Sequence, residues 1–277
     1  MNAPNQWQLS GNAAERYERV LVPAIFAPWA ADLVSLADLR PGERVLDVAC
    51  GTGVVADLPP NALGQGVQIT GLDLNEGMLE VARSQPSPAG AAEVVWVQGS
   101  ALAMRLPDAS FDVVLCQQGV QFFPDRPLAL REMTRVLVPN GRVLASVWEG
   151  PTPYATAMWN AVERHVGADA AATLRKSRAG EDPKALQHLM MQAGFREVKI
   201  VQRTRTARIR AVGDFVLRHL AATPVAGTVE ALSDSVRMVL GGGRSQSVTA
   251  LCRRRWHYLF RMCQRCDRRP LSRPNDV

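Results

Sequence analysis

The sequence predicts an α/β fold, a mostly parallel sheet with helices on both faces, and three observations support this prediction. Short runs rich in β-branched residues alternate with longer amphipathic runs over residues 43–148, which is typical of strand–helix–strand units. The first such strand leads directly into a glycine turn, 50–53 (CGTG). The run 112–116 (DVVLC) has the apolar character of a strand buried on both faces of a parallel sheet.

Five segments in this region have the length and composition of strands. The first ends at the glycine turn, and the turn Asn140-Gly141 leads into the last. Because parallel strands need crossover connections, usually helices, we expect one sheet with helices between its strands. The predicted strands are 44–48, 67–72, 94–97, 112–116 and 142–147.

The connections between these strands carry helix signals. Residues 75–83 place their apolar side chains on one helical face. A further helix opens at Asp125, a residue type that caps helices, and Pro127 suits its first turn. A helix is also expected after the glycine turn, and Pro59-Pro60 end it after barely two turns.

The pattern changes after residue 150, where helical periodicity dominates. Helices that follow the fifth strand would cover the carboxyl edge of the sheet, where open α/β folds bind ligands. We therefore divide the chain into a core over 1–150, a helical cap with one remaining strand over 151–240, and a tail over 241–277. The predicted elements beyond the core are helices 153–166, 183–193, 212–221 and 226–240, and a strand over 198–209.

The net charge of +6 is concentrated at one end of the chain. Residues 241–277 contain nine Arg against two Asp, a net of +7, so residues 1–240 carry a net charge of −1. A nearly neutral body gives no indication of a nucleic-acid partner. The high pI therefore describes the tail and not the ligand of the body.

Composition also bears on the compartment. Hydrophobic residues make up 47% of the chain, enough to bury a core, but we identify no apolar run approaching the roughly 18 residues of a membrane span. The first residues, 1–10, do not have the pattern of a secretory signal. Five cysteines in a chain of this length are typical of a reducing compartment. We expect a cytoplasmic protein without a membrane span.

The segment 45–53 (VLDVACGTG) predicts a nucleotide site. Its glycines permit positive φ angles and close backbone approach, and the amide groups of such a turn favour negative charge. Asp73 ends the second strand 22 residues after Gly51, where a carboxylate can accept ribose hydroxyls with about 1.5–3 kcal/mol. The run 51–56 also fits the G-x-G-x-x-G/A pattern of dinucleotide sites, so spacing alone leaves an NAD(P)-dependent oxidoreductase open.

Four motifs in order resemble those of class I S-adenosylmethionine-dependent methyltransferases, most closely the methyltransferase type 11 branch that includes the ubiquinone and menaquinone enzymes. The match spans roughly residues 10–150 and preserves the motif order. The resemblance implies a Rossmann-like seven-stranded fold whose final strand is antiparallel, with S-adenosylmethionine as cofactor. The residues before the tail form no recognisable metal-ligand cluster, so we expect no metal there. The motifs are LDVACGTG (46–53), GLDLNEGML (71–79), GSALAMRLPDASFDVVLCQQGVQFFPD (99–125) and REMTRVLVPNGRVLASVW (131–148).

The resemblance assigns residues to the methionine and ribose parts of the cofactor. Gly51 and Gly53 would bring backbone against the methionine part, and Asp47, four residues before the first of them, would hold its amino group. Asp73 would hold the ribose. The prediction for the methionine and ribose parts of the cofactor site depends on these four positions.

Further positions match the adenine pocket and its surroundings. Leu74 and Met78 would pack beside the adenine, and Ser100-Ala101 stand where the family often has Asp and a small residue. Gln117 matches a position that faces the methionine part. Tyr17 resembles an N-terminal aromatic residue that closes over the cofactor.

The resemblance implies methyl transfer to a small hydrophobic or aromatic acceptor. The loop 118–123 would border the transferred methyl but contains no histidine, so we assign no catalytic residue. His219, in the predicted cap, is the strongest of the four histidines as a candidate base. A non-catalytic S-adenosylmethionine-binding or nucleic-acid-binding protein on the same fold is the second alternative.

The tail matches no part of the expected fold. Its residues Cys252, His257, Cys263 and Cys266 have a spacing that suits zinc, and the arginines with interleaved aromatic residues suit a nucleic-acid arm. We favour a third hypothesis, in which a GC-rich gene has been read out of frame over 241–277. On that hypothesis the final antiparallel strand is missing from this chain.

Overall fold

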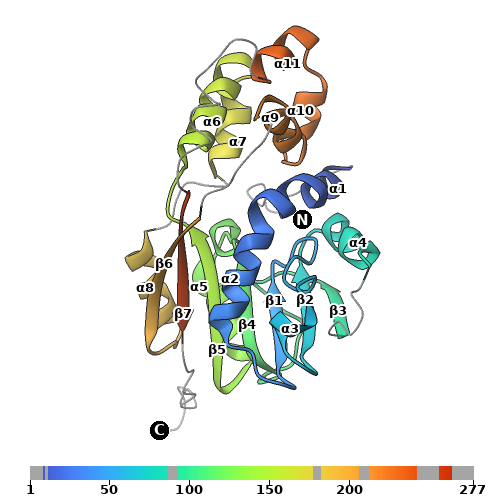
Figure 1. Ribbon diagram of the computed structural model, residues 1–277. Coiled ribbons are helices and arrows are strands. Elements are labelled where there is room, and N and C mark those ends of the chain that lie inside the picture. The colour runs from blue at the N-terminus through green and yellow to red at the C-terminus, as the bar shows by residue number, and fades with distance from the viewer. Residues whose placement is uncertain are drawn as a thin grey trace.

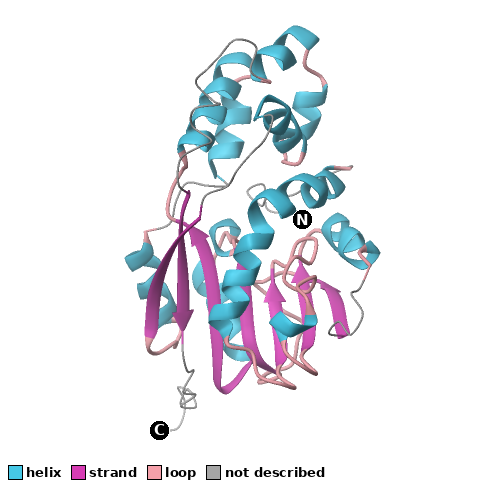
Figure 2. Cartoon of the chain, viewed as in Figure 1, coloured by secondary structure: helices cyan, strands magenta, loops and turns pink. Residues whose placement is uncertain are grey.

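A seven-stranded sheet forms the centre of the protein, in the order β3-β2-β1-β4-β5-β7-β6 (Figures 1 and 2). The computed structural model describes residues 9, 12–86, 93–176, 182–205, 212–241 and 256–263. The strands are β1 (Arg44–Val48), β2 (Gln68–Asp73), β3 (Glu93–Gln98), β4 (Phe111–Gln117), β5 (Leu137–Trp148), β6 (Val198–Arg205) and β7 (Trp256–Cys263). All five strands predicted for the core form, in parallel, which confirms the α/β prediction.

The strand order reverses between β1 and β4. β1 pairs in parallel with β2 on one side and with β4 on the other. The chain therefore continues from β1 toward one edge of the sheet and from β4 toward the opposite edge. In open α/β sheets this reversal opens a crevice at the carboxyl ends of the strands, where ligands bind. The glycine turn follows β1 at this point.

Strand β7 corrects one expectation. It runs antiparallel between β5 and β6, from Val143 paired with Cys263 to Trp148 paired with Tyr258 on one side. The expectation that residues 241–277 hold no candidate for this strand is wrong, because the aromatic run WHYLF supplies it among the arginines. Cys252 and Cys266 lie outside the described residues, so the zinc and reading-frame hypotheses stay untested.

Side chains alternate between the two faces of the sheet and build two cores. Along β1, Val45 enters one hydrophobic cluster while Leu46 and Val48 enter the other. The first cluster includes residues of α2 (Ala27–Ala37) and α3 (Pro60–Leu63), and the second those of α5 (Arg126–Val136) and α8 (Pro183–Gln192). α4 (Glu76–Ser84) packs against β2 and β3.

A group of helices lies beyond the carboxyl ends of the strands, as expected for a cap (Figure 1). The sequence did not predict α7, and the predicted helix 226–240 is two helices, because Ser233 adopts an extended conformation between them. The helices of the cap are α6 (Pro153–His165), α7 (Ala168–Lys176), α9 (Val212–Ala221), α10 (Ala226–Glu230) and α11 (Asp234–Leu240).

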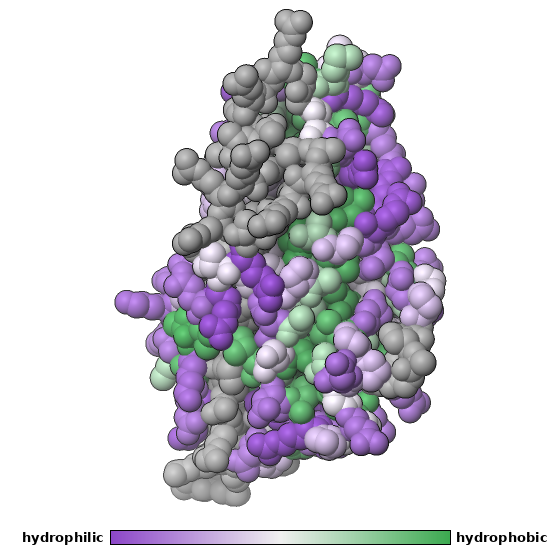
Figure 3. All heavy atoms as spheres, viewed as in Figure 1, coloured by the Kyte–Doolittle hydropathy of each residue, from purple (hydrophilic) through white to green (hydrophobic). Residues whose placement is uncertain are grey.

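An N-terminal helical run crosses one face of the sheet. It comprises α1 (Ala13–Arg16), the π-helical segment η1 (Tyr17–Phe26) and α2. By length and composition alone this run is sufficient to cross a membrane, so the expectation of no such apolar stretch is wrong. Half of its most apolar part is buried inside the protein, where Leu33 is inaccessible to solvent. In the view of Figure 3, hydrophobic side chains form a band flanked by hydrophilic ones.

Candidate functional site

A cavity occupies the point where the strand order reverses. Its walls come from the carboxyl ends of β1 to β5, the N-terminal helical run and the cap, and they enclose about 1260 Å³ including the open mouth. Eight of the ten residues predicted to bind the cofactor line it. They are Tyr17, Gly51, Asp73, Leu74, Met78, Ser100, Ala101 and Gln117.

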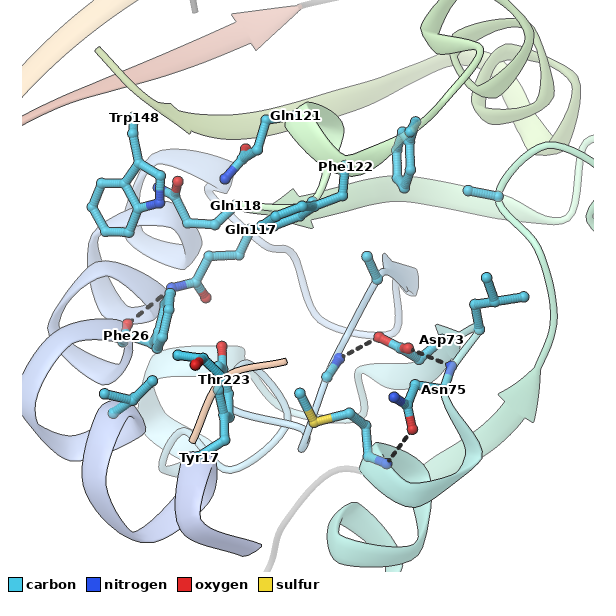
Figure 4. A pocket seen from close by; sticks show the side chains of 18 of the residues that line it. Tyr17, Phe26, Asp73, Asn75, Gln117, Gln118, Gln121, Phe122, Trp148 and Thr223 are labelled. Atoms are coloured by element: carbon cyan, nitrogen blue, oxygen red, sulfur yellow. Dashed lines mark hydrogen bonds between the residues drawn. The ribbon is translucent and has the colours of Figure 1, made fainter. Parts of the chain in front are cut away.

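Asp73 is held rigidly at one end of the cavity. Its two carboxylate oxygens each accept a backbone hydrogen bond, from the Gly51 and Asn75 amides, both at 2.8 Å (Figure 4). Asn75 in turn accepts a hydrogen bond from the Met78 amide and caps α4. Because each carboxylate oxygen has a second lone pair, Asp73 retains capacity to accept hydroxyl donors.

The two glycines of the turn have different roles. Gly51 (φ +58°) lines the cavity and has open space where a side chain would begin, so backbone faces a ligand there. Gly53 (φ +92°) does not line the cavity, and a Cβ on it would lie 2.6 Å from the Trp96 ring. Residues 51–57 form turns where a helix was expected, and α3 begins at Pro60.

Asp47 is buried beside the turn without lining the cavity. Its Oδ1 has no hydrogen-bond partner among the described residues. Burial, together with the charge of Asp73, raises the pKa of Asp47 to about 8, and burial also raises the pKa of Asp73. Asp73 is the only Asp, Glu, Lys or Arg among the described residues lining the cavity. Two buried acids without a cation favour a positively charged ligand.

The other predicted residues surround this acidic end. Tyr17 stacks on Phe26 with ring centroids 5.0 Å apart. The Ser100 hydroxyl accepts a hydrogen bond from the Leu102 amide and so stabilises the turn after β3. Gln117 donates from its Nε2 to the Phe26 carbonyl at 2.8 Å, which joins β4 to the N-terminal helical run.

The opposite end of the cavity is aromatic. Trp148, the last residue of β5, has its ring centroid 6.1 Å from that of Phe26. Gln118 and Gln121 are the polar residues that the β4 loop adds to this end. The apolar residues lining this end are Phe26, Phe122, Phe123, Trp148, Met158, Trp159 and Leu174.

One histidine reaches the cavity from the cap. His219 is 5% exposed, lines the cavity, and has its Nδ1 3.0 Å from the Tyr154 hydroxyl. Its ring stacks with Tyr154 at a centroid distance of 5.7 Å. His165 and His188 do not line the cavity.

Sequence reasoning missed several lining residues, among them Phe26, Asn75, Trp148 and Thr223. Two of them carried a usable signal. Asn75 precedes a predicted helix as a capping residue, and Trp148 ends the fifth strand at the edge where ligands bind. Phe26 and Thr223 are brought to the cavity by tertiary folding, which local sequence patterns do not record.

Comparison with known proteins identifies the family. Residues 46–145 match the methyltransferase domain model. The ubiquinone/menaquinone biosynthesis C-methyltransferase of Shewanella frigidimarina is 31% identical over 191 residues, which cover 64% of this chain and 75% of that protein. The chain belongs to the class I S-adenosylmethionine-dependent methyltransferases.

Other relatives of this methyltransferase match over a shorter length. The demethylmenaquinone methyltransferase of Bacillus cytotoxicus is 34% identical over 124 residues, which cover 45% of this chain and 52% of that protein. The match thus spans about half the length of such relatives.

Solved structures share the fold of the methyltransferase. The Haemonchus contortus phosphoethanolamine N-methyltransferase 2, in complex with phosphomonomethylethanolamine and S-adenosylhomocysteine, superposes with a TM-score of 0.59 at 17% identity, covering 91% of this chain and 56% of that chain. The YcgJ protein of Bacillus subtilis superposes with a TM-score of 0.54 at 21% identity, and the superposition covers 86% of this chain and 99% of that chain. At this identity the likeness concerns the fold.

The residues present fit the cofactor of this family. S-adenosylmethionine carries a sulfonium and an ammonium group, and the acidic end holds Asp73 with Asp47 buried behind its turn. The adenosine part needs hydroxyl acceptors and an apolar pocket, which Asp73, Leu74 and Met78 provide in chemical type. The fit rests on these side chains and on the open backbone at Gly51.

Proposed function

We propose that this methyltransferase transfers a methyl group from S-adenosylmethionine to a small, uncharged aromatic or hydrophobic acceptor. The observation that supports this proposal is one cavity with two chemically different ends. The acidic end suits a cationic nucleoside, and the aromatic end suits a flat apolar molecule. A cavity that joins the two brings both reactants together, which is most of what methyl transfer requires.

In this proposal the acidic end holds the cofactor. Asp73 accepts the ribose hydroxyls while its backbone hydrogen bonds keep the carboxylate oriented. Leu74 and Met78 pack against the adenine, and Ser100-Ala101 border it. Gly51 and Gln117 face the methionine part, with the buried carboxyl of Asp47 nearby, which a bound cation would favour in its ionised form.

The aromatic end orients the acceptor. When bound, S-adenosylmethionine would supply a methyl carbon activated by its positively charged sulfur; the acceptor would bond to that carbon in line as the carbon–sulfur bond breaks, and S-adenosylhomocysteine would leave. The rings of Phe26, Phe122 and Trp148 exclude water and hold a flat acceptor. Positioning of this kind is worth about 7–11 kcal/mol of barrier lowering. We assign no catalytic base.

The names of the relatives suggest the class of acceptor. They are methyltransferases of demethylmenaquinone and of ubiquinone and menaquinone biosynthesis. We extend this to the present chain as a quinol-type acceptor, because its aromatic end has the matching chemistry. A cytoplasmic location and the division into a core (1–150) and a cap (151–240) belong to the same proposal.

Calorimetric titration of the purified protein tests the cofactor. S-adenosylhomocysteine is expected to bind with micromolar affinity, and NADH, the matched control for a dinucleotide site, is expected not to bind. Transfer of a labelled methyl group to quinols, phenols and amines then tests the acceptor class. Tight binding of NADH alone would contradict the proposal, and binding of S-adenosylhomocysteine without turnover of any acceptor would favour a non-catalytic role.

A further inference from the structure

Two glutamines at the aromatic end present unpaired polar atoms to the cavity. The Gln118 side chain donates from its Nε2 to the Ser146 hydroxyl at 3.3 Å, which leaves its Oε1 without a partner among the described residues. Gln121 has neither its Oε1 nor its Nε2 paired with any described residue, and both atoms are buried. Gln118 itself is only 5% exposed.

Unpaired buried amides are costly, so their position indicates a ligand. Burying an amide group without its hydrogen bonds costs about 1–3 kcal/mol. Both residues line the cavity, next to Trp148 and Phe122 and on the loop that follows β4 (Figure 4). Gln117, the last residue of β4, donates to the Phe26 carbonyl of the N-terminal helical run, and we assign its remaining Oε1, also unpaired among the described residues, to the cofactor side. The two remaining amides therefore face the acceptor.

We propose that Gln118 and Gln121 determine acceptor specificity by binding a neutral hydroxyl group on an aromatic ring. This inference rests on the proposed function and adds the residues that select the acceptor. The two amides offer two acceptor oxygens and one free NH2 group. A hydroxyl donates one hydrogen bond and accepts another, so it satisfies both kinds of atom.

Other functional groups match the amides less well. An ether or ketone oxygen accepts but does not donate, so it leaves the amide oxygens unpaired. A carboxylate or ammonium group would be buried without an opposite charge, because the described residues lining this end include no Asp, Glu, Lys or Arg. The site thus disfavours these other groups because they leave amide atoms or charges unpaired, and it favours a hydroxyl because both of its hydrogen bonds are made.

Three naphthalene derivatives test the inference by calorimetry, with the protein saturated with S-adenosylhomocysteine. They are 1-naphthol, 1-methylnaphthalene, in which a methyl group replaces the hydroxyl, and 1-naphthoate, which carries a charge. We expect 1-naphthol to bind at least about tenfold more tightly than either of the others, a ratio equivalent to about 1.4 kcal/mol.

Substitution separates the amides from general packing. In Gln121→Met, and in Gln118→Met, the ratio between 1-naphthol and 1-methylnaphthalene is expected to fall below about threefold, because the thioether fills the same space without a strong hydrogen bond. Gln121→Met is also expected to raise the melting temperature, since two unpaired buried atoms are removed. In Phe123→Leu, the matched control, both affinities weaken and the ratio is retained.

The outcomes distinguish this inference from the proposed function. If the wild-type protein binds S-adenosylhomocysteine but does not bind 1-naphthol, or binds 1-naphthol and 1-methylnaphthalene equally, the assignment of the amides is wrong and the cofactor assignment stands. A ratio that persists in both glutamine variants also overturns the assignment. If S-adenosylhomocysteine itself does not bind, the proposed function fails first.

Discussion

Asp73 is the residue on which the cofactor assignment depends most directly. It lies at the end of β2, lines the cavity and carries a charge held by two backbone hydrogen bonds. We expect Asp73→Ala to weaken S-adenosylhomocysteine binding by roughly 10–150-fold, because a charge-assisted contact of about 1.5–3 kcal/mol is lost. Calorimetric titration measures this change.

The control for this substitution is Asp125→Ala. Asp125 caps α5 by accepting a hydrogen bond from the Leu128 amide and does not line the cavity. Its loss is expected to cost about 0.5–2 kcal/mol of stability and to leave cofactor affinity alone. Equal affinity of Asp73→Ala and wild type would mean that the adenosine lies elsewhere.

Asp47 makes the stability of the free protein depend on pH. Its pKa is raised by burial to about 8 in the folded protein, against an ordinary value of 3.8. Between these values the folded state retains a proton that the unfolded state has lost, so stability falls as pH rises, by at most about 1.4 kcal/mol per pH unit. In Asp47→Asn this decline should shrink across pH 5–8, measured by denaturant unfolding at several pH values.

The same proton gives a second readout on ligand binding. A cation placed near Asp47 lowers its pKa, so S-adenosylhomocysteine, which carries an ammonium group, is expected to release up to about one proton at pH 7. Titrations in phosphate and in Tris would then give different binding heats for wild type and closely similar heats for Asp47→Asn. Identical heats in wild type would place the ammonium group away from Asp47.

At the residue scale, the sequence located cavity-lining residues best where one local motif brings them together. The glycine turn and Asp73 were recognisable because strand, turn and acid occur at a fixed spacing along the chain. Gly53 shows the limit of that reasoning. The motif assigned it to the ligand, but in the structure the position where its side chain would begin lies against the Trp96 ring on β3. Gln121, on the loop after β4, and Trp148, at the end of β5, line one cavity because of tertiary packing, which local sequence patterns do not record.

At the scale of elements, strand β7 determines whether the sheet is complete. It is hydrogen-bonded on both sides, and Leu259 pairs with Val147 on β5 and with Gln202 on β6. Leu259→Pro removes a backbone N–H within a central strand and should lower stability by at least about 2 kcal/mol, or about 4–8 °C in melting temperature. Leu259→Val is the control, because it keeps the ladder. A proline variant as stable as the control would show that the strand contributes nothing.

Elements with a clear period were predictable, and those hidden by composition were not. β4 and α5 follow from an apolar run and from the Asp125 cap, both local signals. β7 was obscured because arginines interrupt its surroundings, so that pairing with β5 and β6, and not its own pattern, places it in the sheet. α7 is rich in alanine, which has high helix propensity but supplies little amphipathic signal.

At the scale of the whole molecule, the cavity couples the core to the cap. Its lining runs from Tyr17 in the N-terminal helical run to Thr223 in the cap, so one ligand contacts parts that are distant in the chain. The buried ring of Tyr154 on α6 joins the same hydrophobic cluster as Val45 on β1. Shared burial of this kind predicts that cap and core unfold together.

Thermal unfolding with and without ligand tests this coupling. At a concentration 100 times its dissociation constant, S-adenosylhomocysteine should stabilise the protein by about 2.7 kcal/mol, which raises the melting temperature by about 5–11 °C. Since residues 151–240 share the cavity and the core cluster with the rest, we expect a single transition that moves as a whole. Two transitions, of which the ligand moves one, would instead establish the cap as an independently folding domain, and the cavity-lining residues Met158 and Trp159 would then be positioned by docking of that domain on the core.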